Sequence, residues 1–180
     1  MVNRGPLVDG FRLAYERVGS GPAVVLLHGW PGDRSDYRLV MPLLAGAVDV
    51  VVPDLRGFGE SDKHPADPAV QYSVDAQARS VIGLIEELGM VRPVLAGYDI
   101  GSRIAQRVAA TRPDLVRALV VSPPLPGIGD RILSADALRE FWYQPFHQLP
   151  LAEQLVDGRP RRSGHTCGIS GPTGPALTSR

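Results

Sequence analysis

The sequence predicts an α/β fold with a mainly parallel sheet and helices on both of its faces. Short aliphatic runs rich in valine are typical of parallel strands covered on both faces, and they lie at 23–27, 50–52, 94–96 and 118–121. Helical patterns lie between these runs, as expected for strands joined by right-handed crossovers. Chemically reactive side chains directly follow three of the strands, at the edge where such sheets gather their functional loops.

The chain is expected to begin with a β-hairpin. Residues 11–18 largely alternate apolar and polar side chains, which is the period-two pattern of a half-buried strand. Leu7 and Val8 are expected in the partner strand, across a turn at Asp9 and Gly10, because Asp-Gly pairs favour tight hairpin turns.

Two helical patterns follow. The clearer one covers residues 74–88, with Ser73 as its N-cap and Gly89 at its end. Its apolar face is expected to pack on the sheet and comprises Ala78, Val81, Ile82, Ile85 and Leu88. The second pattern covers residues 102–111 and precedes the last valine-rich run.

Size, charge and cysteine content exclude several classes of protein. With 180 residues, 44% of them hydrophobic, the chain suits a globular domain with a sizeable core. Nineteen basic residues balance nineteen acidic ones, so we expect a small uncharged partner and neither nucleic acid nor a membrane surface. The first residues lack the apolar core of a signal sequence and no stretch approaches the roughly 18 apolar residues of a membrane span, so a cytoplasmic location is expected. The single cysteine, Cys167, excludes an internal disulfide and a thiolate metal cluster, and we expect neither a cofactor nor a metal.

The most informative segment is the pentapeptide Gly-Tyr-Asp-Ile-Gly at 97–101, between a strand and a helical run. Asp beside Gly is common in ordinary turns. The context favours a sharp strand-to-helix turn in which Gly97 and Gly101 allow close packing and Asp99 is the presented side chain. The partial positive charge of a helix N-terminus keeps such a carboxylate ionised. An ionised carboxylate can attack an electrophilic carbon, and water must then cleave the resulting alkyl ester.

A second segment with unusual chemistry follows the first valine-rich run and consists of His28, Gly29, Trp30 and Pro31. Histidine is a common general base, but we expect His28 to tether its own loop through a side-chain hydrogen bond. The hydrogen-bond donors that this loop can offer to a bound group are then its main-chain N–H groups.

A third segment, at 54–62, follows the next strand and contains two glycines that allow a tight excursion of the chain. Asp54, Arg56 and Asp62 are expected to form a local ion and hydrogen-bond network. We interpret this segment as scaffold, because charged loop residues usually serve solvation or local pairing.

These segments together resemble the α/β-hydrolase superfamily and, within it, the branch of epoxide hydrolases and haloalkane or haloacetate dehalogenases. The motifs are His-Gly-x-Pro, Asp-x-x-Gly-x-Gly-x-Ser-Asp and Gly-x-Asp-x-Gly in that order, and the resemblance covers about residues 11–158. It implies a nucleophile elbow with Asp99 as the nucleophile, and an oxyanion hole formed by the main-chain N–H groups of Trp30 and Ile100. The supporting positions in these motifs are His28, Gly29, Pro31, Gly97 and Gly101.

The choice of branch depends on two positions. Tyr143 matches the place where epoxide hydrolases carry a phenol that hydrogen-bonds the epoxide oxygen, and ring opening needs such a donor because it creates an alkoxide. The alternative is an aromatic residue in the core of the cap, since Phe141, Trp142 and Phe146 surround it. Haloalkane dehalogenases typically carry tryptophan after the nucleophile, where this chain has Ile100. The resemblance therefore favours an epoxide hydrolase, with a dehalogenase and a non-catalytic remnant or binding protein as the alternatives.

The resemblance also implies a histidine after the last strand, oriented by a carboxylate, and the sequence matches neither position. From Arg159 the composition becomes a mixture of Gly, Ser, Thr and Pro without apolar periodicity, which is typical of disorder. We interpret this change as a frame-shifted or mispredicted gene end that truncates the hydrolase. It would remove most of the cap, the last two strands and the catalytic base, and would impair activity. The expected organisation is the N-terminal part of a hydrolase core at 1–130, the start of a cap at 131–158 and a disordered tail at 159–180.

Overall fold

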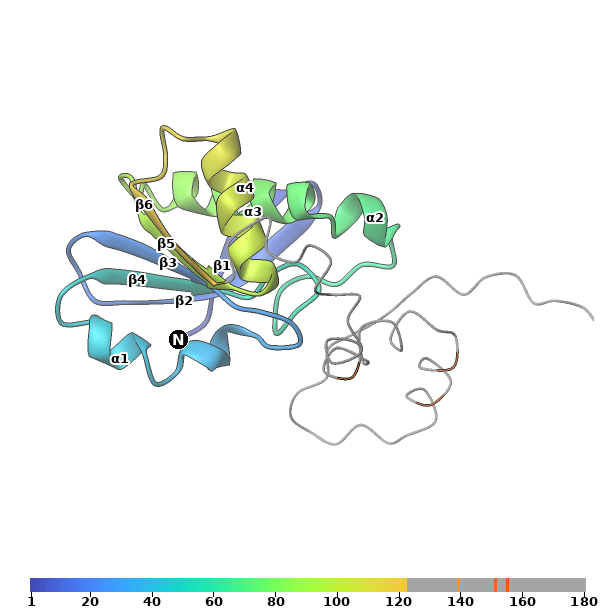
Figure 1. Ribbon diagram of the computed structural model, residues 1–180, viewed down its shortest axis with the longest axis horizontal. Helices are drawn as coiled ribbons and strands as arrows, with labels where there is room; N and C mark the ends of the chain where they lie inside the picture. Colours follow the sequence, from blue (N-terminus) through green and yellow to red (C-terminus); the bar gives the residue numbers. More distant parts are fainter. Residues whose placement is uncertain (123–138, 140–150, 152–154, 156–180) are drawn as a thin grey trace, which may run out of the picture.

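A six-stranded sheet forms the centre of the computed structural model, which describes residues 1–122 together with Arg139, Leu151 and Leu155 (Figure 1). The strands lie in the order β1-β2-β4-β3-β5-β6. Their bounds are β1 Asn3–Val8, β2 Phe11–Val18, β3 Ala23–Leu27, β4 Asp49–Pro53, β5 Val94–Tyr98 and β6 Ala118–Ser122. The expected start of a cap and the expected tail lie outside the described residues, apart from those three single positions.

The sheet is mixed, with its antiparallel part at one edge. Strands β1 and β2 form the predicted hairpin and β2 pairs antiparallel with β4, whereas the remaining three pairings are parallel. The hairpin turns at Asp9 and Gly10, whose φ angles of 51° and 84° are the left-handed values that a tight turn of this kind requires. The α/β class and the parallel arrangement of the valine-rich strands are therefore confirmed.

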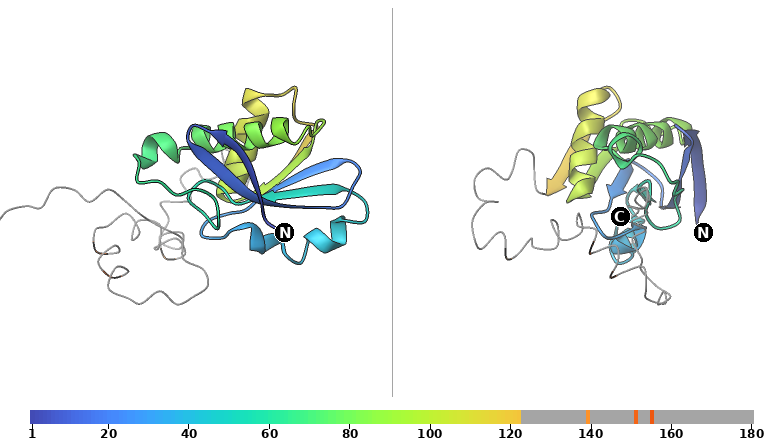
Figure 2. Two further views of the ribbon diagram at one scale, coloured as in Figure 1. Left: turned by 180° about the vertical axis from the view of Figure 1, so that it is seen from behind. Right: turned by 90° about the vertical axis from the view of Figure 1, so that its right-hand side faces the viewer.

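Helices cover both faces of the sheet (Figure 1). Helices α3 (Val74–Glu87) and α4 (Ile100–Thr111) lie on one face. The short helices η1 (Arg34–Tyr37) and α1 (Met41–Leu44) lie on the other, and two further views show the same layers (Figure 2). A four-residue helix, α2 (Pro68–Gln71), precedes α3.

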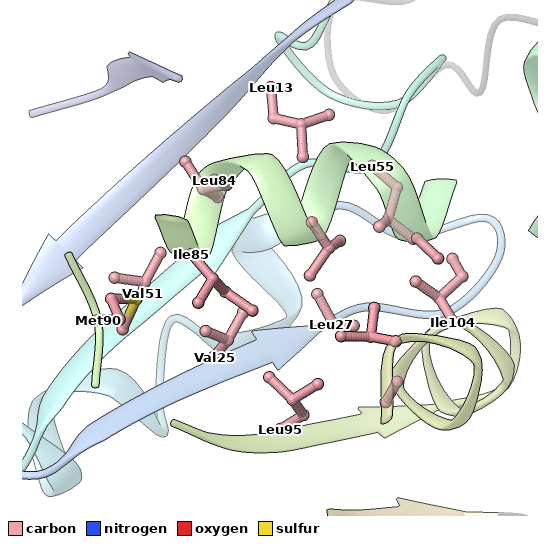
Figure 3. Packing of buried hydrophobic residues seen from close by; sticks show 14 of the residues in the cluster. Leu13, Val25, Leu27, Val51, Leu55, Leu84, Ile85, Met90, Leu95 and Ile104 are labelled. Carbon is pink, nitrogen blue, oxygen red and sulfur yellow. The ribbon is translucent and has the colours of Figure 1, made fainter. Parts of the chain in front are cut away.

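Each face of the sheet contributes to its own apolar core. Under α3 and α4 the larger core contains alternate residues of the central strands and the buried sides of both helices (Figure 3). It includes Leu13, Val25, Leu27, Val51, Leu84, Ile85, Leu95 and Ile104. The smaller core lies on the opposite face and consists of Leu26, Met41, Val50 and Val52. This alternation along β3 and β4 explains why both strands are apolar at successive positions.

Helix α3 matches its prediction to within one residue. The side chain of Ser73 accepts a hydrogen bond from the Ala76 N–H at 3.2 Å, as expected of an N-cap. Gly89 has a φ of 60°, which favours glycine directly after a helix. The apolar face is confirmed, with Ile82 and Leu88 partly buried. The sequence pattern missed Ala76 and Leu84, which are 0% and 1% exposed.

The order of the strands places a topological switch point between β3 and β5. These two strands are parallel neighbours, with Leu27 opposite Gly97 in register. The chain leaves β3 toward η1 and α1 on one face of the sheet and leaves β5 directly into α4 on the other. Parallel sheets bind ligands outside the carboxyl ends of strands at such a point of divergence. The segments that follow Leu27 and Tyr98 are therefore the first place to look for a functional site.

Strand β6 forms one edge of the sheet in the described part of the chain. It pairs with β5 on one side, and the side chains of Leu119 and Val120 are 37% and 64% exposed. An exposed apolar strand edge is a template for pairing with other chains. Among the described residues, no helix combines the length and the apolar character needed to cross a membrane.

A lysine at the exposed edge should reduce self-association. We expect Val120→Lys to raise the soluble fraction of the expressed chain without lowering the urea midpoint of unfolding, because a charge on an edge strand discourages pairing. The control is Val121→Lys, which places the charge on a side chain packed against the larger core and should lower the midpoint. Equal solubility of Val120→Lys and the parent chain would contradict this account of β6.

Candidate active site

The turn between β5 and α4 is built around Asp99. This residue is the N-cap of α4 and has φ 50° and ψ −122°, a strained conformation for a residue with a side chain. Such a conformation costs about 1–3 kcal/mol and persists only where the surroundings fix it. One fixing contact is the hydrogen bond from the Asp99 N–H to the Ser122 carbonyl oxygen of β6, at 2.9 Å. The predicted sharp strand-to-helix turn is therefore present.

The two flanking glycines are needed for space. A Cβ atom on Gly97 would lie 2.6 Å from the carbonyl carbon and oxygen of Gly101. A Cβ atom on Gly101 would lie 2.6 Å from the His28 carbonyl oxygen and still closer to that of Leu27. These neighbours are main-chain atoms that cannot rotate away, so any larger residue would push the helix from the strand. The close packing expected at both glycines is what the structure shows.

The loop after β3 lies against this turn. The Trp30 N–H donates a hydrogen bond to Asp99 Oδ2 at 2.8 Å. Gly29 allows the approach, because a Cβ atom there would lie 2.9 Å from the Asp99 Cβ. Pro31 follows through a cis peptide bond. The structure thus brings together Asp99 and Trp30, which are 69 residues apart in the sequence.

The Asp99 carboxylate is exposed, and a hydrogen bond to one of its two oxygens fixes its orientation. Oδ2 accepts the hydrogen bond from Trp30, whereas Oδ1 has no hydrogen-bond partner within residues 1–122. Ile100 is the first residue of α4, and the first N–H groups of a helix have no acceptor within it. The site therefore combines one directed carboxylate, one amide already bound to it and a second amide at the adjacent helix end.

His28 holds the loop and is not placed to act as a base. Its ring is fully buried, with Nε2 accepting from the Leu55 N–H at 3.0 Å. Nδ1 must then carry the proton, and it donates to the Gly29 carbonyl oxygen at 2.9 Å. Burial lowers the pKa of His28, although the Gly29 hydrogen bond opposes the shift. The neutral ring joins two neighbouring loops, which confirms the predicted tether.

The segment at 54–62 is scaffold, but its charged residues do not pair with one another as expected. The fully buried carboxylate of Asp54 accepts from the Arg34 N–H at 2.8 Å, from the Glu60 N–H at 2.7 Å and from the Arg34 guanidinium. Arg34 begins η1, so this pair fixes the end of the loop after β3, whereas His28 fixes its start. Removing one partner of such a buried pair would leave a buried charge uncompensated.

The other two charged residues of this segment also bind elsewhere. Arg56 is buried, donates to Ser80 at 2.7 Å and to Asp9 at 3.1 Å, and lies over the Phe11 ring. Asp62 accepts from Arg4 and from the Arg12 N–H, at 3.0 and 2.7 Å. The predicted mutual network of Asp54, Arg56 and Asp62 is wrong, because the side chains of all three bind partners outside the segment.

The structure adds two residues to the site that sequence reasoning missed. The Tyr98 hydroxyl donates to Asp36 Oδ2 at 2.5 Å, and the Tyr98 ring lies against Gly29. Tyr98 lies inside the pentapeptide at 97–101, so its place next to Asp99 could have been predicted. Nothing in the sequence pattern marks Asp36. Tyr143, the expected phenol donor, lies outside the described residues. In the described part of the chain, no three His, Cys, Asp or Glu side chains gather as a metal site.

Residues 22–160 match the protein family described as the alpha/beta hydrolase fold. The chain belongs to this family. It is 36% identical over 122 residues to a soluble epoxide hydrolase from Corynebacterium sp. strain C12, covering 68% of this chain and 41% of that protein. It is 38% identical over 150 residues to a fluoroacetate dehalogenase from Burkholderia sp., covering 79% of this chain and 48% of the relative.

A solved structure supports the same assignment. The epoxide hydrolase CorEH superposes with a TM-score of 0.75 and 31% identity, covering 88% of this chain and 56% of that one. The resemblance carried by the three motifs is thus confirmed for the α/β-hydrolase fold, with relatives named as epoxide hydrolase and as dehalogenase. The chain spans less than half the length of the two curated relatives.

Gly101 should be intolerant of any side chain. We expect Gly101→Ala to lower the free energy of unfolding by about 1–3 kcal/mol, because the added methyl group meets the carbonyl oxygens of Leu27 and His28. Urea titration followed by tryptophan fluorescence measures the change. Gly46→Ala is the matched control, since a Cβ atom there has no neighbour within 4 Å, and it should be nearly neutral. Equal losses in both variants would contradict the packing argument.

Burial of neutral His28 should make stability depend on pH. Since its folded pKa lies below the unfolded value of about 6.5, the unfolded chain binds more protons, and stability falls as pH drops below 6.5. The slope from one such group is at most about 1.4 kcal/mol per pH unit. We expect His28→Gln to show a smaller loss between pH 7.5 and 5.5 than the parent chain in urea titrations. A parent slope in His28→Gln would contradict the buried neutral ring.

Proposed function

We propose that Asp99 is the nucleophile of an epoxide hydrolase-like enzyme that forms an alkyl ester with a small uncharged electrophile. The observation that carries this proposal is the hydrogen bond from the Trp30 amide to Asp99 Oδ2 at a strained strand-to-helix turn. Nucleophiles on such turns are exposed at the edge of the sheet, and strain of this kind clusters at functional sites. The relative named as a soluble epoxide hydrolase and the structural neighbour CorEH favour the epoxide as substrate class.

The chemistry of the first step follows from the two carboxylate oxygens. Oδ1 attacks a ring carbon of the epoxide, and a new carbon–oxygen bond forms while the ring carbon–oxygen bond breaks. The electron pair of the broken bond moves to the epoxide oxygen, which becomes an alkoxide and takes one proton from a donor. We assign this donor role to Tyr143, as an expectation from its place in the sequence. The product of this step is a hydroxyalkyl ester of Asp99.

The Trp30 amide serves the second step. When water attacks Cγ of the ester, negative charge develops on Oδ2, the oxygen that the Trp30 N–H already contacts. Donors fixed before charge develops stabilise it without reorganisation, and losing one such donor typically costs about 10²–10³ in rate. Ile100 would supply the second amide, since its N–H stands at the start of α4. Cleavage then returns the carboxylate and releases a diol.

The second step also needs a base to activate water, and the described histidines do not suit this role. Both ring nitrogens of His28 are engaged in hydrogen bonds within the scaffold. His64 contacts the Gly10 carbonyl oxygen and the Phe11 ring at the β1–β2 hairpin. His147 and His165 lie outside the described residues. We therefore propose that residues 1–122 support formation of the ester better than its hydrolysis, and that the ester accumulates.

A dehalogenase is the second candidate, favoured by the relative named as a fluoroacetate dehalogenase. The same carboxylate would then displace a halide, which leaves with its electron pair and needs no proton donor. The mass of the ester distinguishes the two reactions: an epoxide adds its whole mass to Asp99, whereas an alkyl halide adds its mass less that of hydrogen halide. The remaining candidate is a binding protein that retains the site without forming any ester.

The decisive experiment is mass spectrometry of the chain after incubation with styrene oxide, a reactive terminal epoxide. We expect the peptide that contains Asp99 to gain the full mass of the epoxide, and Asp99→Asn to abolish this gain because an amide is a poor nucleophile. Asp75→Asn is the control, since it removes another exposed carboxylate from the surface pair with Arg107 and should leave the adduct unchanged.

Three results would count against the proposal. Steady release of diol without an adduct would contradict accumulation of the ester. An adduct with chloroacetate and none with the epoxide would favour the dehalogenase. No adduct with either probe, together with equal affinity of the parent and Asp99→Asn for a non-reactive epoxide analogue, would favour a binding protein.

A further inference from the structure

Tyr98 makes two contacts that join the nucleophile turn to the loop carrying the Trp30 amide. Its hydroxyl donates to Asp36 Oδ2 in η1 at 2.5 Å. Its ring lies so close to Gly29 that a Cβ atom there would be 2.9 Å from the Tyr98 Cδ2. Gly29 directly precedes Trp30, so the residue before the nucleophile packs on the residue before the amide donor.

Other contacts hold the rest of the loop to the scaffold. His28 is fixed to Leu55, and Arg34 to the buried Asp54. The hydroxyl of Tyr37 donates to the Leu27 carbonyl oxygen at 3.0 Å. These contacts fix the loop to the sheet and to the segment at 54–62. The loop and the turn also meet through the hydrogen bond of the Trp30 amide and through close main-chain packing at Gly29 and Gly101. Tyr98 adds a side-chain hydrogen bond between the two.

The donor character of Tyr98 is well defined. Burial raises the pKa of the hydroxyl, and its hydrogen bond to Asp36 raises the pKa further. The phenol therefore keeps its proton at neutral pH and donates to the carboxylate, which makes a short charge-assisted hydrogen bond. Asp36 in turn sits where Gly32 has no side chain, since a Cβ atom on Gly32 would overlap its carboxylate. Both residues are exposed, and the contact is therefore defined by its short hydrogen bond and by the packing of Tyr98 on Gly29 and of Asp36 on Gly32.

We propose that the Tyr98–Asp36 hydrogen bond positions the Trp30 amide against Asp99. Tyr98 is a positioning residue in this account, because it acts through the loop and touches no reacting atom. The effect of Tyr98 on the reactivity of Asp99 rests on the proposed function. Its effect on the position of the Trp30 amide rests on geometry alone. Small displacements of a fixed donor have large consequences, since a shift of about 1 Å can cost about 10²-fold in rate.

The test uses hydrogen exchange of the Trp30 amide, measured by NMR in the full chain. We expect Tyr98→Phe, which keeps the ring and removes the hydroxyl, to accelerate this exchange by about tenfold or more while the urea midpoint stays near that of the parent. Asp36→Ala should do the same, and Asp36→Asn should restore slow exchange because its amide oxygen still accepts. Tyr72→Phe is the matched control: it also loses a hydroxyl, which contacts His64, and should leave Trp30 unchanged.

The rate of Asp99 alkylation by styrene oxide provides the second readout. The Trp30 amide also fixes the orientation of the Asp99 carboxylate before it attacks, so we expect Tyr98→Phe and Asp36→Ala each to slow alkylation by about tenfold. The double variant should be no slower than either single variant. An unchanged exchange rate of the Trp30 amide in Tyr98→Phe would overturn the inference. Faster exchange throughout the chain, with a lowered urea midpoint, would also overturn it. If the parent forms no adduct the proposed function fails, whereas the exchange measurement still decides the role of Tyr98.

Discussion

The candidate site depends on the close approach of two main-chain segments at the carboxyl ends of β3 and β5. At this point the carbonyl groups of Leu27 and His28 touch Gly101, and Gly29 touches both Tyr98 and Asp99. Only glycine leaves room for such contacts, so Gly29, Gly97 and Gly101 determine where the carboxylate can stand. The strained backbone of Asp99 is acceptable because these contacts, and the hydrogen bond of its N–H to β6, allow little else.

From this constraint the electrostatic arrangement follows. A carboxylate at the N-terminus of α4 faces the positive end of a helix dipole, and the Trp30 amide binds one of its two oxygens. The buried scaffold around it consists of neutral or paired groups: His28 is neutral because burial lowers its pKa, and Asp54 is paired with Arg34. The exposed carboxylate of Asp99 is therefore the group at this switch point that we propose to react.

Much of this arrangement could be predicted from the sequence because its causes are local. Valine-rich runs identified the strands, Ser73 and Gly89 bounded α3, and the spacing of Gly97 and Gly101 around Asp99 identified the turn. The pairs that fix the loop after β3 could not be predicted. Arg34 and Asp54 are 20 residues apart and Tyr98 and Asp36 are 62 apart, so only the folded chain shows which charged residue meets which. For the same reason the expected network within 54–62 was wrong, since neighbours in sequence found partners on other elements.

The central claim is that Trp30 binds one oxygen of Asp99 and leaves the other for the electrophile. A crystal structure of the chain after reaction with an epoxide tests it most directly. The account predicts an ester through Oδ1, with the remaining carbonyl oxygen about 2.7–3.1 Å from the Trp30 nitrogen, the distance expected of an oxyanion donor. An ester through the oxygen next to Trp30, or a carboxyl group rotated away from that amide, would contradict it.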